Sequence, residues 1–454
     1  MEQIEQRNKM AAKPVFPLLM SMAFPPMLSM LVQSMYNIVD SMFVARFSQD
    51  ALTAVSLAFP LQNLVLAVAV GTGVGVNSYI SRKLGAQDQD AANAAVTHGF
   101  LLSFAHAVFF VIFGLVAIRP FFRLFTDSAE IFSLACDYSY IVVLGAFAQL
   151  FHIMVEKLLQ ATGRMLAPML LQAIGAIANI ILDPILIFGL FGAPKMGVTG
   201  AAVATVIGQC VACIVAGICN HKFNHEVRLS FRGFRPDLKI IGHIYAVGIP
   251  SIIMQSISSI MTYCMNLILV QFTVTATAIF GVYFKLQSFF FMPVFGLNNG
   301  ITPIIAYNYG ARHRKRMLKT VKVSMFIAFC FTFIGFLAFE FIPKTLLGLF
   351  SASEDMLTIG IPALRIIGIH YLIAWFCIIA GTVFQALGKA VFSMIVSIMR
   401  QLFVLVPAAY ILASIGGLHA VWWSFPIAEI ISLIVSVTFL VVINRTIIQK
   451  IPEA

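Results

Sequence analysis

The sequence predicts an all-α integral membrane protein with twelve transmembrane helices in two six-helix bundles, related by a pseudo-two-fold axis along the membrane normal. Three observations predict this fold: the apolar composition, the spacing of the apolar runs and an internal repeat. Of the 454 residues, 60% are apolar and 10% are charged, and the mean hydropathy is +0.96. Soluble domains carry about 45–50% apolar and about 25% charged residues. The composition therefore excludes a chain built from soluble domains.

The apolar runs are long enough to cross a bilayer, because a membrane-spanning helix needs about 20 apolar residues. Reading the runs between polar breaks predicts twelve spans, at about residues 15–43, 52–79, 93–118, 131–158, 165–190, 197–219, 241–270, 276–305, 320–342, 357–384, 391–413 and 418–444. Twelve spans leave only loops and short ends, so no separate soluble domain is expected.

The basic residues predict the orientation of these spans. The N-terminus, the even-numbered loops with the span ends that adjoin them, and the C-terminus hold 21 of the 29 lysines and arginines. By the positive-inside rule, both termini are cytoplasmic. The net charge of +11 is then an orientation signal, and nucleic acid is not an expected partner. Residues 220–240 are the predicted cytoplasmic linker between an amino-terminal lobe, residues 1–219, and a carboxy-terminal lobe, residues 241–454.

The two halves of the chain repeat at an offset of 225 residues. Pro25 matches Pro250, Gly71 matches Gly296, and Gly85 matches Gly310. Each half holds an even number of spans, so both halves enter the membrane in the same direction, as in the parallel repeats of secondary transporters. The single Gly-Lys pair, at Gly388, lacks the first glycine of a P-loop. No nucleotide or other cofactor is expected, and an ion gradient is the predicted energy source.

The fifth span carries the best candidate for binding that ion. An ionisable group in a bilayer costs about 2.5–3.5 kcal/mol on insertion scales, so each one is a functional candidate. Asp183 follows Gln172 and Asn179 on one helical face. Pro184 comes next, and its missing N–H leaves a backbone carbonyl free. Thr205, in the sixth span, is a candidate to complete the ligand set.

The first span carries a second candidate acid, Asp40, close to its predicted outer end. A polar stripe precedes it on the same helical face, formed by Gln33, Tyr36 and Asn37. Pro25 and Pro26 lie about four turns earlier and predict a bend. Two interpretations stay open for Asp40, an ion-binding group or a side chain in the headgroup region. Na⁺ bound by Asp40 and Asp183 is one predicted form of the ion site.

Further polar groups are candidates for lining a substrate cavity. At the 225-residue offset, Asp40 and Asp183 become Met265 and Ala408, so the ion chemistry is predicted in the amino-terminal lobe. The candidates for the cavity are Gln33, Tyr36, Asn37, Glu156, Gln172, Gln255 and Lys285. Glu156 belongs either to a helix-end cluster whose polar groups are all hydrogen-bonded or to a cavity wall. Glu429 either binds a cation or pairs with Lys285.

Several stretches resemble the multidrug and toxic compound extrusion (MATE) transporters, and some of them most resemble the bacterial DinF-like branch. These stretches are residues 160–163 (QATG), 179–189 (NIILDPILIFG), 197–205 (GVTGAAVAT), 281–287 (GVYFKLQ) and 303–310 (PIIAYNYG). The resemblance implies two six-helix bundles around a V-shaped cavity, and antiport of organic cations against H⁺ or Na⁺. It implies that Asp40 and Asp183 are the coupling carboxylates, with Tyr36, Asn179 and Thr205 in the same pocket.

The predicted function is therefore a multi-pass antiporter of the bacterial cytoplasmic membrane, surrounded by lipid and acting as a monomer, that exports amphipathic, cationic drugs or toxic compounds. The alternative is a flippase for a lipid-linked sugar precursor, which predicts a cavity rich in cations that bind pyrophosphate. A channel or receptor without coupled exchange would tolerate the loss of Asp40 and Asp183. An enzyme fits worst, since the sequence has neither a metal cluster nor a paired nucleophile and base.

Overall fold

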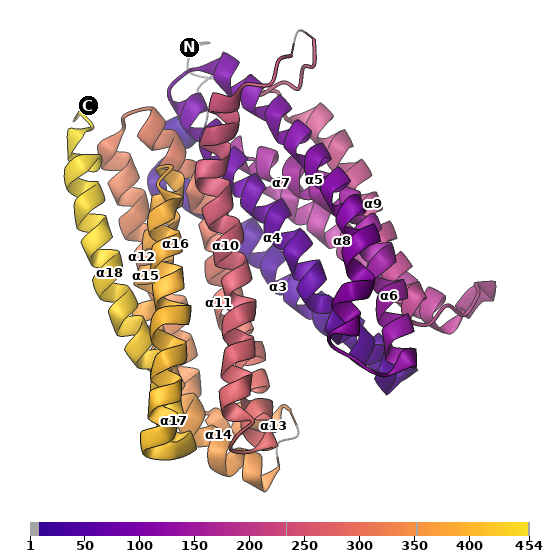
Figure 1. Ribbon diagram of the computed structural model, residues 1–454. Helices are drawn as coiled ribbons and strands as arrows, with labels where there is room; N and C mark the ends of the chain where they lie inside the picture. The colour runs from indigo at the N-terminus through magenta and orange to yellow at the C-terminus, as the bar shows by residue number, and fades with distance from the viewer. Residues whose placement is uncertain (1–8, 233, 351–352, 453–454) are drawn as a thin grey trace. The chain divides into compact units, whose positions relative to one another are not determined.

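The computed structural model describes residues 9–232, 234–350 and 353–452, and all regular structure within these ranges is helical. Side chains at 35–42, 45–46, 49 and 52 are outside the description. Ten helices of the described chain are long and apolar enough to cross a membrane, and two bent helix pairs raise the number of spans to twelve. The predicted twelve-span helical fold is confirmed (Figure 1).

The helices fall into two series along the chain. The first series is α2 (Lys9–Ala12), α3 (Val15–Phe47), α4 (Gln49–Gly85), α5 (Gln89–Arg123), α6 (Ala129–Leu144), α7 (Ala146–Ala161), α8 (Leu166–Phe188), the short 3₁₀ turn η1 (Leu190–Gly192) and α9 (Val198–Phe223). The second series is α10 (Leu238–Leu269), α11 (Val274–Gly310), α12 (Arg314–Phe341), α13 (Pro343–Gly348), α14 (Glu354–Gly368), α15 (Tyr371–Ala386), α16 (Ala390–Ile398), the π-helical turn η2 (Met399–Leu405), α17 (Val406–Val421), α18 (Ser424–Thr446) and η3 (Ile448–Lys450).

The backbone repeats with the offset that the sequence predicts. Helices α4 and α11 have matching bounds, and so do α7 and α15. Ser48 caps the start of α4 by accepting from the Ala51 amide, and Thr273 caps α11 by accepting from Ala276. Left-handed backbone also recurs in pairs: Gln87 with Arg312 (φ 59° in both), Gly163 with Gly388 (81° and 76°), and Gly192 with Gly417 (83° and 64°). The internal repeat is therefore a repeat of structure as well as of sequence.

Two helices each contribute to both compact units of the chain. One unit comprises residues 28–252, and the other comprises residues 1–27 with 253–454. The divisions fall inside α3 and α10, just after Pro26 and Pro250. The predicted lobes, residues 1–219 and 241–454, assign each of these helices whole to one lobe. The difference arises because the first part of each helix packs with the other half of the sequence.

Small residues make that packing possible. A Cβ added at Gly71 would lie 2.8 Å from the backbone nitrogen of Ile252 in α10. Its counterpart in the other unit is Gly296, where a Cβ would lie 2.7 Å from the carbonyl oxygen of Pro26 in α3. Helix backbones approach this closely in membranes where small residues recur every four positions. Gly71 with Gly75, and Gly296 with Gly300, form Gly-x-x-x-Gly motifs, so the motif has a packing role once in each unit.

The linker between α9 and α10 lies along the start of α5. The Asn93 side chain accepts from the Arg228 amide at 2.8 Å, and the ring of buried His98 accepts from the Asp237 amide at 2.8 Å. The start of α5 is therefore hydrogen-bonded to two separate parts of the linker. The linker is thereby fixed to the unit formed by residues 28–252.

Three breaks interrupt the predicted spans. Helices α6 and α7 form one span bent by 44° at Gly145, and α14 and α15 form another bent by 49° at Ile369 and His370. The eleventh span contains the π-helical turn η2 between α16 and α17. Apolar periodicity predicts none of these breaks, because it reports that a segment is apolar and not how its backbone bends.

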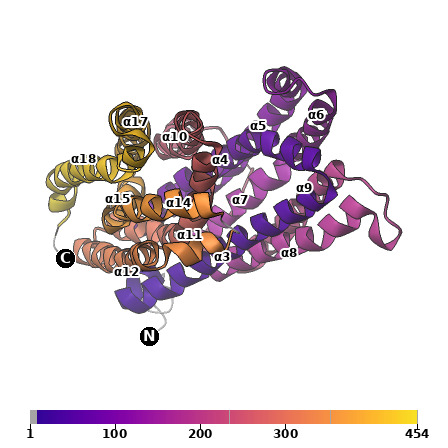
Figure 2. The ribbon, with the colours of Figure 1, turned by 90° about the horizontal axis from the view of Figure 1, so that it is seen from below.

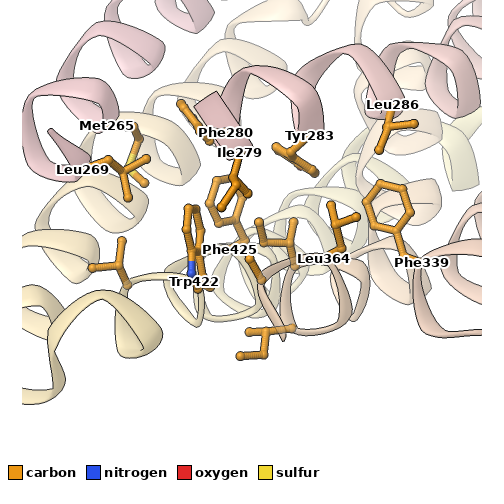
Figure 3. Close-up of a cluster of buried hydrophobic side chains, with 14 of the residues drawn as sticks. Met265, Leu269, Ile279, Phe280, Tyr283, Leu286, Phe339, Leu364, Trp422 and Phe425 are labelled. Carbon is orange, nitrogen blue, oxygen red and sulfur yellow. The ribbon is translucent and has the colours of Figure 1, made fainter. Parts of the chain in front are cut away.

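A dense apolar cluster stabilises the unit formed by residues 1–27 and 253–454, which we call the carboxy-terminal unit (Figure 3). The unit formed by residues 28–252 is called the amino-terminal unit. The fully buried members of the cluster include Tyr283 of α11 and Trp422, which lies between α17 and α18. The Tyr283 ring centre lies 5.4 Å from that of Phe425 of α18, in an edge-to-face arrangement. Such aromatic pairs add about 0.5–1.5 kcal/mol to the free energy gained by burial. The cluster fixes the positions of α11, α14 and α18 in the carboxy-terminal unit.

Candidate functional site

Helices α8 and α9 lie side by side in the unit formed by residues 28–252 (Figures 1 and 2). They touch at Gly175 and Gly208, where a Cβ on Gly208 would lie 2.9 Å from the Gly175 carbonyl oxygen and 3.3 Å from the Asn179 Cβ. Because this contact admits no side chain at 208, it brings Thr205 of α9 against Asn179 of α8. The helical face of the fifth span that carries Asn179 and Asp183, the predicted ion-binding face, is the face that α8 buries.

The Asn179 amide joins the buried acid to the neighbouring helix. Its orientation follows from the hydrogen bonds that it makes. The amide nitrogen donates to Asp183 Oδ2 at 2.7 Å, and the amide oxygen accepts from the Thr205 backbone N–H at 3.0 Å and from the Thr205 hydroxyl at 3.2 Å. Asp183, Asn179 and Thr205 are thus brought together as the sequence analysis expects. We call these three residues the Asp183 site.

The Asp183 site is enclosed. Asp183 has no exposed surface, and Asn179 is 2% exposed. A buried carboxylate is stable only when it is hydrogen-bonded and neutralised by a proton or a cation. Pro184 lies inside α8 and supplies no N–H, so the Ile180 carbonyl lacks its helical donor. The site therefore brings together the oxygen atoms of a carboxylate, an amide and a hydroxyl.

Part of the predicted site lies outside the described residues. The backbone of α3 is helical through Tyr36, Asn37 and Asp40, but their side chains belong to the segment that the structure leaves undescribed. Gln33 is described and is partly exposed. Among the described residues, no group of three or more His, Cys, Asp or Glu is arranged to hold a metal ion. Na⁺ binding by Asp40 and Asp183 therefore stays a prediction.

A second polar network surrounds Glu156 on α7. Glu156 accepts from Gln160 at 2.8 Å and from Gln172 of α8 at 3.0 Å. Lys157 donates to Gln160 at 2.9 Å, and its ammonium lies 3.8 Å from Glu156. Both charged residues are buried, at 4% and 3% exposure. This geometry agrees with one of the two interpretations of Glu156, a helix-end cluster whose polar groups are hydrogen-bonded. Contact of Glu156 with substrate stays a prediction.

The carboxy-terminal unit contains an ion pair that sequence reasoning did not find. Arg400 Nη1, on the π-helical turn η2, lies 3.1 Å from Glu429 Oε2 on α18. Lys285 does not pair with Glu429: it is exposed on α11, with its ammonium 5.9 Å from the centre of the Phe350 ring. Gln255 is partly exposed on α10. Two opposite charges in consecutive spans were the available signal for the Arg400–Glu429 pair.

A membrane protein built from two parallel repeats, with a buried and hydrogen-bonded carboxylate in one of them, has the organisation of a secondary transporter. The MatE family model matches residues 25–185 and again residues 250–411, one match in each half of the chain. The chain therefore belongs to the MatE family, the multidrug and toxic compound extrusion transporters. Members of this family are transporters and not enzymes, and this chain is a multi-pass protein of the cell membrane.

Individual relatives agree with this assignment. The multidrug export protein MepA of Staphylococcus aureus is 28% identical over 434 residues, which are 94% of this chain and 93% of that protein. A protein of Shewanella oneidensis described as an FAD transporter is 24% identical over 94% of this chain and 95% of its own length. A solved structure described as an outward-facing multidrug resistance MATE transporter has a TM-score of 0.91, with 27% identity over 97% of this chain and 99% of that chain.

Proposed function

We propose that this protein is an antiporter that exports amphipathic, cationic compounds in exchange for H⁺ or Na⁺, with coupling at the Asp183 site. The observation that carries the proposal is a carboxylate with no exposed surface, bridged by an amide to a second helix, inside a membrane span. The family membership and the similarity to MepA support export of small molecules.

The physical basis of exchange is competition for one negative charge. In a bilayer, an ionised Asp183 must be neutralised by a proton, by Na⁺ or by the cationic group of a substrate. Each of these neutralises the same charge, so the binding of one weakens the binding of the others. A carrier that returns only with an ion bound, and exports only with substrate bound, then exchanges the two.

The hydrogen bonds around Asp183 couple its charge to the position of α9. Asn179 donates to the carboxylate and accepts from Thr205, so a change at Asp183 changes the bond between α8 and α9. Charge-assisted hydrogen bonds are about twice as strong as neutral ones. Neutralisation of Asp183 is therefore expected to weaken the bond to Asn179, and this change is the local event that ion binding produces.

Two prolines are the proposed bend of the first helix. Pro25 and Pro26 lie inside α3, and the boundary between the compact units follows directly, between Met27 and Leu28. A proline inside a helix removes a hydrogen bond at a cost of about 3 kcal/mol or more. The helix is therefore weakest where it passes from one unit to the other. We place the conformational change that accompanies exchange at this point.

The test is efflux from reconstituted vesicles. Ethidium is loaded, and an imposed proton gradient is compared with an imposed Na⁺ gradient. Exchange of one H⁺ for one monovalent cation is electroneutral, so each pH unit supports about tenfold accumulation, about 1.4 kcal/mol. Efflux driven by one gradient and lost in Asp183→Asn would establish antiport and identify the ion.

The matched control is Glu340→Gln, which also removes a carboxylate from a membrane helix. Glu340 lies at the end of α12 with 40% of its side chain exposed, 3.9 Å from Arg365. Its loss is expected to leave gradient-driven efflux unchanged. Equal loss in both variants would mean that Asp183 supports folding rather than coupling.

An anionic cargo is the second candidate, because one relative is described as an FAD transporter. FAD efflux from the same vesicles tests it. The lipid-linked sugar flippase needs clustered cations, and in the described chain Arg400 pairs with Glu429 while Lys157 bonds within the Glu156 network. Lys285 is exposed but is a single charge, so this alternative is weaker than either form of export.

A further inference from the structure

The carboxy-terminal unit has its own polar site on the helices that correspond to α8 and α9. The ion pair joins Arg400 of η2 to Glu429 of α18, and these two elements pack against each other. The Tyr283 and His370 rings of the same unit lie with their centres 6.4 Å apart. The His370 ring bonds the Ile367 carbonyl at 2.6 Å through Nδ1, which therefore carries a proton. We call Arg400 and Glu429 the Arg400 site.

Comparison of the two repeats shows that this site stands where the unit of residues 28–252 has close packing between α8 and α9. At the 225-residue offset, Arg400 corresponds to Gly175 and Glu429 corresponds to Ala204. In the amino-terminal unit these small residues let α8 and α9 touch, and a Cβ on Gly175 would lie 3.2 Å from the Cβ of Ala212. In the carboxy-terminal unit an ion pair and a π-helical turn occupy the same place. π-Helical turns are rare and frequently occur at functional sites.

The ion pair is incompletely satisfied, unlike a purely structural one. The bond from Nη1 is the one hydrogen bond that Arg400 makes to the described residues, although a guanidinium has five N–H donors. Glu429 Oε1 is buried and has no hydrogen-bond partner within the described chain. The Arg400 side chain is 34% exposed, whereas that of Glu429 is 3% exposed. In this conformation Arg400 is thus the more exposed of the two charged groups.

We propose that the Arg400 site binds an anionic group, a carboxylate or a phosphate, of the transported compound. A planar guanidinium presents donors in the fork geometry that matches these groups. The inference rests on the proposed function, because it assigns a substrate class to the exporter. It assigns an anionic group to the exported cationic compounds and therefore predicts a preference for zwitterionic cargo.

Glu429 acts as the resident counter-ion of Arg400. While no anion is bound, it balances the arginine charge, which would otherwise be costly within the membrane. An incoming carboxylate competes with Glu429 for the same guanidinium. The two residues therefore have opposite effects on affinity for an anion. Removal of Arg400 weakens binding, whereas neutralisation of Glu429 strengthens it, and a merely structural salt bridge would make both changes harmful.

The test compares two dyes that differ in one carboxylate. Rhodamine 110 has a free carboxylate, and rhodamine 123 is its methyl ester. Binding to the full protein in phosphatidylcholine nanodiscs is followed by fluorescence anisotropy, and the ratio of the two dissociation constants is the readout. Arg400→Gln is expected to reduce the preference for rhodamine 110 by about tenfold or more, from the loss of a charged hydrogen bond. Glu429→Gln is expected to increase it.

Three controls separate this effect from misfolding. The double variant with Arg400→Gln and Glu429→Gln leaves no buried unpaired charge and is expected to match Arg400→Gln. Rhodamine 123 binding verifies that each variant is folded. Arg365→Gln, in the more exposed ion pair with Glu340 of the same unit, is expected to leave the ratio unchanged.

Other results would overturn the inference. A ratio that is the same in wild type, Arg400→Gln and the double variant refutes it, because rhodamine 123 binding shows that each variant is folded. Equal changes from Arg400→Gln and Glu429→Gln refute it as well. If phosphatidylglycerol in the nanodisc removes the dye preference, the anion is a lipid headgroup and the assignment to transported compounds is wrong. If the wild type neither binds rhodamine 123 nor shows gradient-driven efflux, the proposed function is refuted instead.

Discussion

Substitution of Gly208 by alanine tests the contact that builds the Asp183 site. The added Cβ would lie 2.9 Å from the Gly175 carbonyl oxygen and 3.3 Å from the Asn179 Cβ. Backbone atoms do not move aside as a flexible side chain does, so α8 and α9 must separate by about 0.5 Å to reach ordinary contact. Overpacking of this kind costs about 1–3 kcal/mol.

The separation also reaches the polar bridge. The Thr205 donors lie 3.0 and 3.2 Å from the Asn179 oxygen, and an extra 0.5 Å takes both beyond about 3.2 Å, the usual limit for such bonds. Gly208→Ala is therefore expected to reduce ion-driven efflux as well as the melting temperature. A shift of about 2–4 °C per kcal/mol applies to a unit of this size, so a decrease of about 2–12 °C is expected relative to a glycine-to-alanine change on the same helix that meets no neighbour.

Gly217 provides the matched control on the same helix. It also lies in α9, and a Cβ there meets nothing within 4 Å. Both substitutions gain the same helix propensity, about 1 kcal/mol, so the difference between them reports the contact alone. Thermal unfolding and vesicle efflux would be measured for both variants. If Gly208→Ala behaves like Gly217→Ala in both assays, the close contact does not position the site.

Three further predictions test the site, the repeat and a helix cap. Thr205→Val removes one hydroxyl bond but keeps the backbone bond to Asn179, so it should cost about 0.5–1.5 kcal/mol in unfolding and reduce efflux less than Asp183→Asn; an effect equal to Asp183→Asn would contradict this. Gly163→Ala and Gly388→Ala each place a side chain in left-handed backbone, and each should lower the free energy of unfolding by about 1–2 kcal/mol; a loss in one alone would mean that the repeat does not extend to these turns. Asp88 caps α5, and the hydrogen bond from Lys83 at 2.7 Å holds the pKa of the Asp88 carboxyl below its ordinary value, with help from the Ala91 amide. The cap should therefore persist at neutral pH and be lost only as pH falls through that lowered pKa, whereas Asp88→Ala should already speed hydrogen exchange of the Ala91 amide at pH 7.

Much of this fold is predictable from the sequence because membrane helices are specified by simple rules. The length and apolarity of each segment predict the membrane spans, and the offset of 225 residues predicts the internal repeat. Gly163 and Gly388, which are 225 residues apart, have the same left-handed backbone. One helical face carries Asn179 and Asp183, so their contact follows from spacing within a single helix. These features depend on residues close together in the chain.

The features that sequence reasoning missed depend on contacts between helices. The bend at His370 and the π-helical turn at Arg400 are backbone changes that apolar periodicity does not record. Helical spacing leaves the partner of Glu429 open, because it gives the helical face of a residue but not the neighbour opposite that face. The structure pairs it with Arg400, since α18 packs against η2. The passage of α3 from one unit to the other is likewise a tertiary feature.

Obligatory exchange at Asp183 is tested by driving that exchange backwards. Vesicles containing the protein receive an ethidium gradient with no imposed ion gradient, while internal pH and internal Na⁺ are followed with fluorescent indicators. The dye gradient is expected to move one of these ions in the opposite direction in wild type, and not in Asp183→Asn. Dye that equilibrates with no ion movement, or equal ion movement in Asp183→Asn, would contradict it.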